Sequence, residues 1–339
     1  MAKIGIGVIG LGRMGQVYAT FSASQLADTS LVAVADMRAD VIASFADRVG
    51  GAKTYTDYHD LLADPNVQAV IVTTPTSTHH EVVIAAAAAG KAIFCEKPTA
   101  LTLSATDEMI AAVEKAQVMF QVGFMRRFDA GYAAAKRQLE SGAIGDPVVI
   151  RSIGRDPFRT SLEYANPAVS GGLILDMAIH DFDLLRWLMG DEVQRVYTEV
   201  ASLVYPELES VGDVDNAMMT LRFEGGGLGN VEVSRTANYG YDIQCNVIGT
   251  KGALQIGYLQ ETPVLILTPE GARHDIVPHF PQRFGTAYTT QIAHFVECLR
   301  DGKSPSVTAK DARAALQIGL AATRSQHEGR IVYVNEINT

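Results

Sequence analysis

The sequence is poor in cysteine and has no long hydrophobic run. Cys95, Cys245 and Cys298 are far apart, without Cys-x-x-Cys spacing, which argues against a disulfide framework and a zinc site. No apolar run reaches the roughly 18 residues of a transmembrane helix. Met1 leads almost at once into an apolar run, which leaves no room for a signal peptide. These absences predict a cytoplasmic protein in a reduced compartment.

An excess of positive charge is also missing. The chain has 28 Lys and Arg against 38 Asp and Glu, for a net charge of −10. This balance disfavours nucleic acid and anionic membrane surfaces as partners. With 339 residues, 47% of them hydrophobic, the chain is long enough for two domains with substantial cores. A soluble protein that acts on a small molecule fits these limits.

What the sequence does contain, near its start, is an ordered series of local signals. The apolar run 4–9 leads into Gly10-Leu11-Gly12-Arg13-Met14-Gly15, and a helical pattern follows. A second apolar run, 31–35, is closed by Asp36. Strand, glycine turn, helix, strand and acid is the order that a dinucleotide-binding βαβ unit requires. A glycine-rich turn of another α/β fold is the alternative, which the flanking elements disfavour.

Each residue type in the turn has a physical role. Gly10 permits a tight turn, Gly12 lets the backbone approach a pyrophosphate, and Gly15 lets the helix pack against the strand. Arg13 and Met14 open the helix, whose free N–H groups and positive dipole end favour phosphate. We therefore expect these five residues to bind the cofactor.

Asp36 and Arg38 bear on the choice of cofactor. A carboxylate at the end of the second strand accepts hydrogen bonds from the ribose hydroxyls and repels a 2′-phosphate, so NAD is favoured over NADP. The guanidinium of Arg38 weakens this preference for NAD, because it pairs well with phosphate.

Strand and helix patterns alternate over the first third of the chain. Further strands are expected at 68–73, 92–95 and 118–122, and helices at 78–89 and 103–115. Such alternation predicts an N-terminal Rossmann domain with a doubly wound parallel sheet over residues 1–124.

The pattern then changes to consecutive strands. Helices are expected at 130–138, 173–188, 287–299 and 309–325, and strands at 147–153, 193–204, 217–223, 228–234, 242–249, 253–257, 264–267 and 332–334. Consecutive strands with short turns predict a mainly antiparallel sheet. Residues 125–339 are thus expected to form a C-terminal α/β domain.

Lys97 is the first candidate for chemistry. It lies in Glu96-Lys97-Pro98, directly after the strand that ends at Cys95. Ligands of doubly wound sheets bind outside the carboxyl ends of the strands, which places Lys97 near a bound nicotinamide. The alternative is a lysine that faces solvent.

Asp176, His180 and Asp183 form the second candidate. Their spacing puts them on one polar stripe of a helix. Asp181 falls among the apolar positions, and the pattern does not explain it. The stripe has three interpretations: a solvated face, a metal site or an acid/base site. A metal needs more ligands than this stripe supplies, and we expect none.

The acid/base interpretation suits hydride transfer from a secondary alcohol. That reaction needs a base for the hydroxyl proton and a positive group beside the developing alkoxide. His180 can serve as the base, because an imidazole in general titrates near neutral pH. Asp176 can orient His180 or hold a neighbouring hydroxyl. A protonated Lys97 can hydrogen-bond the reacting oxygen.

At these residues the chain resembles the glucose–fructose oxidoreductase/inositol dehydrogenase family over nearly its whole length. The glycine turn, Glu96-Lys97-Pro98 and the segment from Gly171-Gly172 to His180 follow the family's order and spacing. The resemblance implies a Rossmann domain, a second domain whose open antiparallel sheet mediates dimers or tetramers, and catalysis by Lys97, Asp176 and His180. It also implies a wider site. Cofactor contacts are expected at Thr74, Pro75, His79 and Glu96, and substrate contacts at Arg127, Arg155, Asp156, Tyr239 and Tyr241, with Tyr288 and Gln291 as weaker candidates.

Within the family the chain looks most like inositol 2-dehydrogenases. Gly154 and Asp156 stand where some of those enzymes carry histidine and asparagine, which leaves the polyol open. The expected activity is NAD-dependent oxidation of myo-inositol to its 2-keto product. Another inositol, an anhydrosugar or an aldose is the alternative substrate, and a non-catalytic NAD-binding regulator is the alternative class.

Overall fold

The structure is a computed structural model that describes residues 3–46, 48 and 51–338. It divides into two compact units. The first contains the chain up to Phe124 together with Tyr288–Arg313, and the second contains Met125–Ala287 and Ala314–Asn338. Helices α10 (Phe280–Asp301) and α11 (Ala309–Glu328) each begin in one unit and end in the other. The return of the chain to the first unit was not expected from the sequence.

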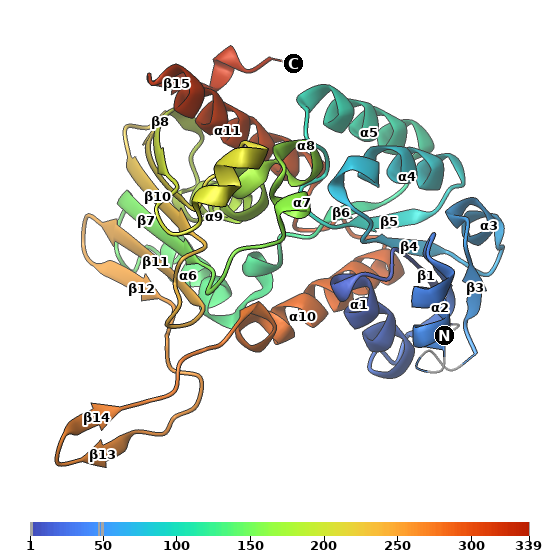
Figure 1. Cartoon of the computed structure of the whole chain (residues 1–339). Coiled ribbons are helices and arrows are strands. Elements are labelled where there is room, and N and C mark those ends of the chain that lie inside the picture. The colour runs from blue at the N-terminus through green and yellow to red at the C-terminus, as the bar shows by residue number, and fades with distance from the viewer. Residues whose placement is uncertain (1–2, 47, 49–50, 339) are drawn as a thin grey trace. The chain divides into compact units, whose positions relative to one another are not determined.

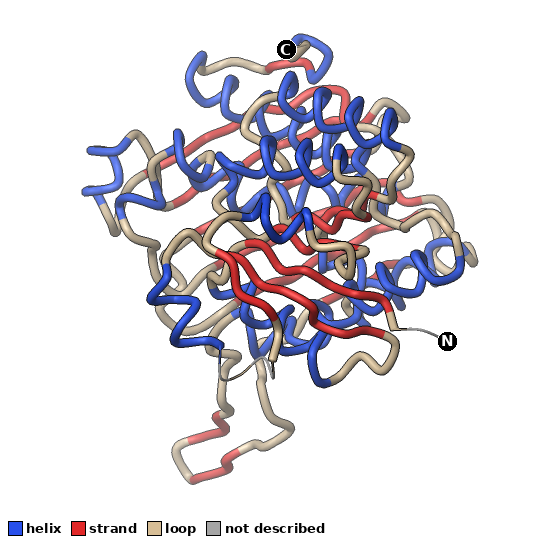
Figure 2. Tube along the Cα trace, turned by 90° about the vertical axis from the view of Figure 1, so that its right-hand side faces the viewer, coloured by secondary structure: helices blue, strands red, loops and turns tan. Residues whose placement is uncertain are grey.

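The first unit is built on a six-stranded parallel sheet. Its order is β3-β2-β1-β4-β5-β6, so the chain order reverses between β1 and β4. Figure 1 labels β1, β3, β4, β5 and β6 of this sheet, and Figure 2 shows strands in red and helices in blue along the chain. The strands are β1 (Ile4–Ile9), β2 (Thr29–Ala35), β3 (Lys53–Tyr55), β4 (Ala69–Val72), β5 (Ala92–Cys95) and β6 (Phe120–Val122). This arrangement confirms the doubly wound sheet. Ligands of such sheets bind at the point where the strand order reverses.

Helices cover both faces of this sheet, which is why β4 and β5 are apolar at every position. The helices between its strands are α1 (Arg13–Ser24), α2 (Ala39–Ala46), α3 (Tyr58–Ala63), α4 (Thr76–Ala88) and α5 (Leu103–Ala116). The core joins Ile6 and Val8 of β1 to Phe94 of β5 and Phe295 of α10. Thr102 caps α5, since its hydroxyl accepts the Ala105 N–H at 3.2 Å.

The second unit is built on a seven-stranded mixed sheet of order β12-β11-β7-β10-β9-β8-β15. Only β7 and β10 pair in parallel; their neighbours pair antiparallel, which confirms the mainly antiparallel sheet. The strands are β7 (Pro147–Arg155), β8 (Val193–Ala201), β9 (Asn216–Phe223), β10 (Leu228–Ser234), β11 (Asp242–Gly249), β12 (Ala253–Ile256) and β15 (Val332–Tyr333). Because β7 and β10 are parallel, their carboxyl ends lie at the same edge.

Helices α6 (Ala130–Glu140) and α9 (Ile179–Met189) of the second unit contact strands of this sheet. The other helical segments of this unit include the 3₁₀ turns η1 (Met125–Phe128), η3 (Pro206–Val211) and η4 (Val334–Glu336) and the helices α7 (Leu162–Ala165) and α8 (Pro167–Ser170). The single helix expected over 173–188 is wrong in one respect. A π-helical turn, η2 (Ile174–Ala178), precedes α9. Such turns recur at functional sites.

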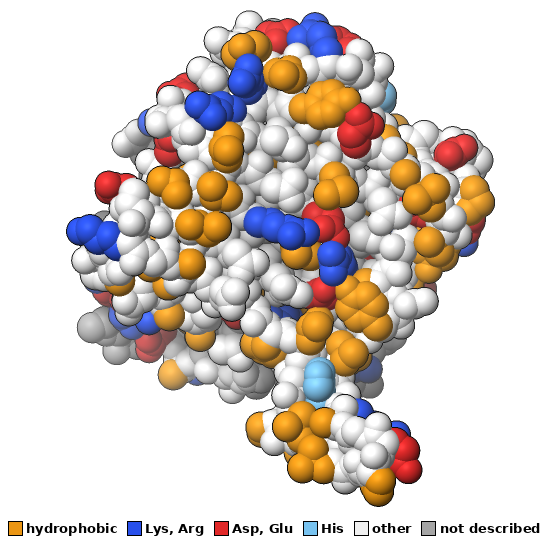
Figure 3. All heavy atoms as spheres, turned by 90° about the vertical axis from the view of Figure 1, so that its left-hand side faces the viewer, with side chains coloured by type: hydrophobic (Ala, Val, Ile, Leu, Met, Phe, Trp, Pro, Cys, Tyr) orange, Lys and Arg blue, Asp and Glu red, His pale blue; other side chains and the backbone are white. Residues whose placement is uncertain are grey.

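The strand expected at 264–267 does not join the main sheet. Strand β13 (Ile266–Thr268) pairs with β14 (Gly271–Arg273) in a separate hairpin that extends away from the sheet of its unit (Figure 1). Val264, Leu265 and Leu267 are exposed, and Figure 3 shows hydrophobic side chains gathered on this hairpin. Among the described residues, no helix combines the length and hydrophobicity that crossing a bilayer requires.

Candidate active site

The glycine turn of the first unit is shaped by close backbone contacts. Gly10 has a φ of +94°, and a Cβ there would lie 2.8 Å from the Thr74 nitrogen. A Cβ on Gly15 would lie 1.8 Å from the Gly10 oxygen, so only glycine fits. Gly12 differs, since nothing lies within 4 Å of its Cβ position. Gly10 and Gly15 are thus required by packing, whereas the open space at Gly12 suits a ligand that approaches the backbone.

The N-terminus of α1 supports the same conclusion. Gly12 is its N-cap, no side chain caps it, and no acidic residue lies in its first turn. The first turn of this helix therefore contains no carboxylate of its own that would compete for its N–H groups. An uncapped helix start beside an open glycine fits the pyrophosphate of a dinucleotide.

Asp36 lies beside this turn. Its Oδ2 accepts the Leu11 N–H at 2.8 Å, and its Oδ1 accepts the Arg38 N–H at 3.0 Å and the Arg38 Nε–H at 3.2 Å. Partial burial works against ionisation, but the bonds from Arg38 and Leu11 outweigh it and lower the pKa of Asp36. An ionised carboxylate at this place fits a ribose with free hydroxyls. Arg38 folds back onto Asp36, and its side chain remains 57% exposed.

His79 has a role that the sequence did not reveal. Its Nδ1 lies 2.8 Å from the Pro98 oxygen and its Nε2 lies 2.8 Å from the Thr74 oxygen, and the residue is buried. Both ring nitrogens thus lie within hydrogen-bond distance of backbone carbonyls, so His79 ties the loop after β4, which carries Thr74 and Pro75, to the loop after β5. The cofactor contact expected of His79 stays a prediction.

Glu96 is likewise held inside the first unit. The Tyr18 hydroxyl donates to its Oε1, and the Lys97 N–H donates to its Oε2 at 3.2 Å. Gln291 of α10 donates to the Tyr18 oxygen at 2.7 Å. A Cβ on Gly123 would lie 2.9 Å from the Glu96 Oε2. Burial raises the pKa of Glu96. The carboxyl therefore anchors the peptide of Lys97, whose side chain is partly exposed.

In the second unit, two glycines explain the start of the π-helical turn. Gly171 has a φ of +85° and Gly172 of +68°. A Cβ on Gly172 would lie 2.7 Å from Oδ1 of Asp213, and that oxygen accepts the Leu173 N–H at 2.8 Å. The glycine pair thus makes room for a carboxylate that fixes the first residues of the turn.

Asp176 lies within this turn, four residues before His180. Its Oδ2 accepts from Arg235 Nη2 at 2.9 Å, and its Oδ1 accepts from the Tyr164 hydroxyl at 3.2 Å. Arg235 also donates to Asp213 at 3.3 Å. His180 is buried at the first turn of α9. An oriented carboxylate and an imidazole on adjoining turns are groups that can bind and deprotonate a hydroxyl.

Two other carboxylates of this helix, one of them in the predicted polar stripe, form buried ion pairs. Asp181 is fully buried and accepts from Arg126 Nη1 at 2.5 Å and from Ser152. Asp183 accepts two bonds from Arg127, that from Nε at 2.8 Å, and both side chains are buried. Asp183 therefore does not share a solvated face with Asp176. Arg127, expected at the substrate, is engaged by Asp183 in the structure.

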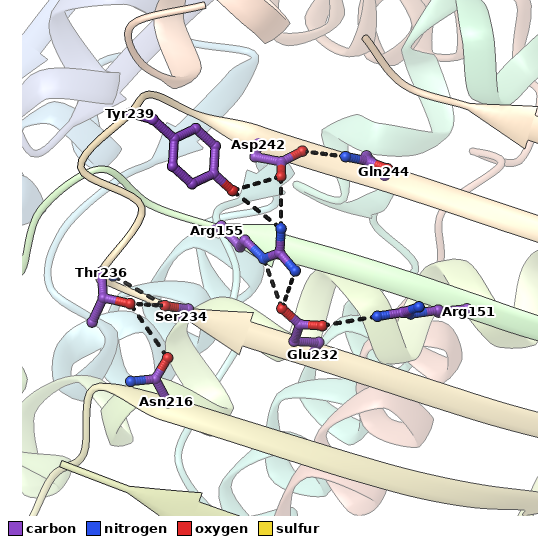
Figure 4. A network of polar contacts seen from close by, with 9 residues as sticks. All are labelled: Arg151, Arg155, Asn216, Glu232, Ser234, Thr236, Tyr239, Asp242 and Gln244. Atoms are coloured by element: carbon purple, nitrogen blue, oxygen red, sulfur yellow. Dashed lines mark hydrogen bonds and ion pairs between the residues drawn. The ribbon is translucent and has the colours of Figure 1, made fainter. Parts of the chain in front are cut away.

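Arg155 and Tyr239 belong to a different part of the second unit. Arg155 donates to Glu232, to Asp242 at 2.9 Å and to the Tyr239 hydroxyl at 3.1 Å (Figure 4). Ser152 of β7 faces Asp181 of α9, and successive strand residues alternate between faces, so Arg155 lies on the opposite face. The structure does not bring Arg155 and Tyr239 together with Asp176 within this unit.

The remaining candidates are placed as follows. Asp156 follows β7 and donates its backbone N–H to the Ser234 oxygen at 2.8 Å. Tyr241 is buried, with its ring edge-on to Phe284. Tyr288 packs near Tyr18 in the first unit. Their roles at a substrate stay predictions.

Sequence reasoning missed Arg235, Asp213 and Tyr164. Arg235 directly follows the expected strand 228–234, and nothing in the sequence paired it with a carboxylate 59 positions away. Among the described residues, no group of three or more His, Cys, Asp and Glu could hold a metal ion.

The fold and these groups define an NAD-binding oxidoreductase, and comparison with known proteins identifies the family. Residues 4–124 match the oxidoreductase family's NAD-binding Rossmann fold, and residues 136–335 match its C-terminal alpha/beta domain. The chain belongs to the glucose–fructose oxidoreductase/inositol dehydrogenase family.

Its relatives include inositol dehydrogenases. The chain is 41% identical to myo-inositol 2-dehydrogenase of Thermotoga maritima, over 98% of this chain and 99% of that protein. It is 40% identical to scyllo-inositol 2-dehydrogenase (NAD(+)) of Bacillus subtilis, over 97% and 95%. Scyllo-inositol dehydrogenase from Lactobacillus casei, solved with NAD(H) and scyllo-inositol, superposes with a TM-score of 0.94 at 30% identity, over 98% and 99% of the two chains.

Proposed function

We propose that the protein oxidises a cyclic polyol with NAD, and that its substrate is myo-inositol, converted to the 2-keto product scyllo-inosose. The observation that carries this proposal is the arrangement of Asp176, held by Arg235 on a π-helical turn immediately before His180. The inositol dehydrogenases among the relatives support the substrate class.

Three side chains have separate roles in the proposed reaction. His180 takes the proton of the reacting hydroxyl, and the Lys97 ammonium stabilises the oxygen as it becomes negative. Asp176 accepts a hydrogen bond from the substrate. When bound, NAD accepts the hydride that leaves the carbinol carbon. The alcohol thus becomes a ketone, and the products are the ketone, NADH and one proton.

The cofactor preference follows from Asp36. Its ionised carboxylate suits the ribose hydroxyls of NAD and repels the 2′-phosphate of NADP. Arg38 already pairs with Asp36, so it is less able to neutralise that phosphate. We expect a lower kcat/KM with NADP than with NAD, measured with the same polyol.

A panel assay tests the activity. The purified protein is mixed with NAD and with myo-inositol, scyllo-inositol, levoglucosan or glucose, and the absorbance of NADH is followed. The proposal predicts the highest kcat/KM with myo-inositol. A higher value with scyllo-inositol would support the second candidate, which the 40% identical relative favours. Binding of NAD without oxidation of any polyol or sugar would contradict an enzyme and indicate a cofactor-binding regulator.

We also propose that the protein is a cytoplasmic homo-oligomer, a dimer or a tetramer. Exposed apolar side chains support self-association, namely those of the hairpin around Leu267 and of Met218 and Ile248 on the sheet. Sedimentation velocity at micromolar concentration tests the assembly, and a monomer would contradict it.

A further inference from the structure

Arg235 is a buried charged side chain to which the proposed mechanism assigns no chemical step. It is 1% exposed and is among the largest fully buried side chains of the described residues. It follows β10, at the sheet edge shared with the carboxyl end of β7. Removing a guanidinium from water is costly unless anionic partners replace the lost hydration. Arg235 has two such partners, Asp176 and Asp213.

The two carboxylates are held differently. Asp213 is 5% exposed, and its Oδ1 is fixed by the Leu173 N–H beside Gly172. Burial raises the pKa of Asp213. The Asp176 side chain is 16% exposed, and of the two carboxylates it has the shorter bond to Arg235, 2.9 Å against 3.3 Å. Asp213 is thus fixed by the backbone at Leu173 and in turn holds the guanidinium of Arg235. The guanidinium then fixes the position of Asp176.

The second oxygen of Asp176 has a partner that a substrate can replace. The Tyr164 hydroxyl lies 3.2 Å from Oδ1, and Tyr164 is 40% exposed. A polyol hydroxyl offers the same donor. Among the described residues, the titratable and charged groups near Asp176 include Tyr164 of α7 and Arg235 after β10, with Asp213 in contact with Arg235 and His180 four residues along the chain.

We propose that Arg235, anchored by Asp213, is a positioning residue that keeps Asp176 ionised and directs one of its oxygens to a substrate hydroxyl. This inference rests on the proposed function, because it gives Asp176 the role of hydrogen-bond acceptor in polyol oxidation. A guanidinium in contact with a carboxylate favours its charged form, and the bond fixes the carboxylate plane.

Substitutions at Arg235 test the kinetic consequence. Arg235→Met is expected to lower kcat/KM for the polyol by about 10- to 100-fold, the effect of one lost charge-assisted bond. The KM for NAD should stay unchanged, and the acid limb of the pH profile should move to higher pH. Arg235→Lys keeps the charge and should restore part of the loss. Arg151→Met is the control, since Arg151 is half exposed and pairs with Glu232 on the opposite sheet face.

A second measurement does not depend on turnover. Carbon-13 NMR of labelled aspartate carboxyls follows the titration of Asp176, whose signal is assigned by its loss in Asp176→Asn. In Arg235→Lys and Arg235→Met this titration should move to higher pH than in the wild type. Failure of the wild type to oxidise any polyol would sink the proposed function and leave this readout intact.

An unmoved titration would overturn the inference. So would an Arg235→Met protein that melts at a lower temperature but keeps the wild-type kcat/KM and pH profile, because a purely structural ion pair gives that result. If Arg235→Met does not fold, Arg235→Lys and Asp213→Asn give the same comparison.

Discussion

The two units hold their chemical groups in different ways. In the first unit, backbone groups hold Asp36 and His79. The Leu11 N–H donates to Asp36, 25 positions away, and the ring of His79 lies between carbonyls 5 and 19 positions away. In the second unit, charged side chains from distant segments hold the helical acids. The separations are 55 for Arg126 and Asp181, 56 for Arg127 and Asp183, and 59 for Arg235 and Asp176.

This difference predicts which substitutions each unit tolerates least. Backbone-built positions tolerate no added atoms, because a Cβ at Gly10 or Gly15 meets main-chain atoms that cannot move away. Positions built from buried ion pairs tolerate no loss of charge, because the remaining partner stays buried and unpaired. We therefore expect the first unit to be most sensitive to substitutions that add atoms at its glycines, and the second unit to substitutions that remove one partner of a buried ion pair.

The largest expected effect comes from removing one reactive group from each unit. Lys97→Ala and His180→Ala should each lower kcat by about 10²- to 10⁴-fold, as loss of a positioned acid or base does. NAD should still bind, as judged by its effect on the melting temperature. Lys115→Ala, a change at an exposed position, is the matched control. A variant that keeps a tenth or more of the wild-type kcat would remove its residue from the mechanism.

The buried ion pairs should contribute far more to stability than exposed ones. Asp181→Asn leaves Arg126 buried beside a neutral partner and should lower the free energy of unfolding by about 3–5 kcal/mol. Asp28→Asn breaks the exposed pair with Arg300 and should cost less than about 1 kcal/mol. Urea denaturation compares the two variants, and equal losses would refute the distinction between buried and exposed ion pairs.

Gly12 and Gly15 separate ligand exclusion from loss of packing. Gly12→Ala adds a Cβ that meets nothing in the structure, so stability should stay within about 0.5 kcal/mol of the wild type. The same Cβ stands where the pyrophosphate must approach, and NAD affinity should fall by about tenfold or more, an overpacking cost of ~1–3 kcal/mol. Gly15→Ala should instead lower the stability. Calorimetric binding and melting measure both effects, and unchanged NAD affinity in Gly12→Ala would contradict the assignment.

The smallest expected effect is a pH dependence at Glu96. Burial raises its pKa, so the folded protein holds a proton that the unfolded chain releases sooner. The contribution of this group to stability is complete below its ordinary pKa and is lost as pH rises through the folded value. Glu96→Gln should remove that decline, which cannot exceed about 1.4 kcal/mol per pH unit. Unfolding free energies from pH 4.5 upward test the sign, and a wild type that gains stability relative to the variant as pH rises would disagree with it.

Sequence reasoning succeeded where structure is set locally. The apolar run 4–9, the glycine turn and the acid at 36 are contiguous signals, and the structure has β1, α1 and Asp36 in the expected places. Short elements near the edge of the parallel sheet were harder to predict from the sequence. β3 has three residues and α3 has six, too few to show a period.

Sequence reasoning failed where residues distant in the sequence determine the local structure. The helical pattern over 173–188 carries no trace of the π-helical turn, because Asp213, about 40 positions away, fixes its start. Asp181 seemed misplaced among apolar neighbours until Arg126 and Ser152 supplied its contacts. The residues of 264–267 are apolar enough for a sheet core, yet they lie in an exposed hairpin.

The central claim is that Lys97 and His180 serve the same hydroxyl. A crystal structure of the protein with NAD and myo-inositol tests it most directly. The account predicts one ring hydroxyl within about 2.6–3.2 Å of both the Lys97 Nζ and a ring nitrogen of His180, with its carbon against the nicotinamide. A bound inositol whose hydroxyls contact neither side chain would contradict it.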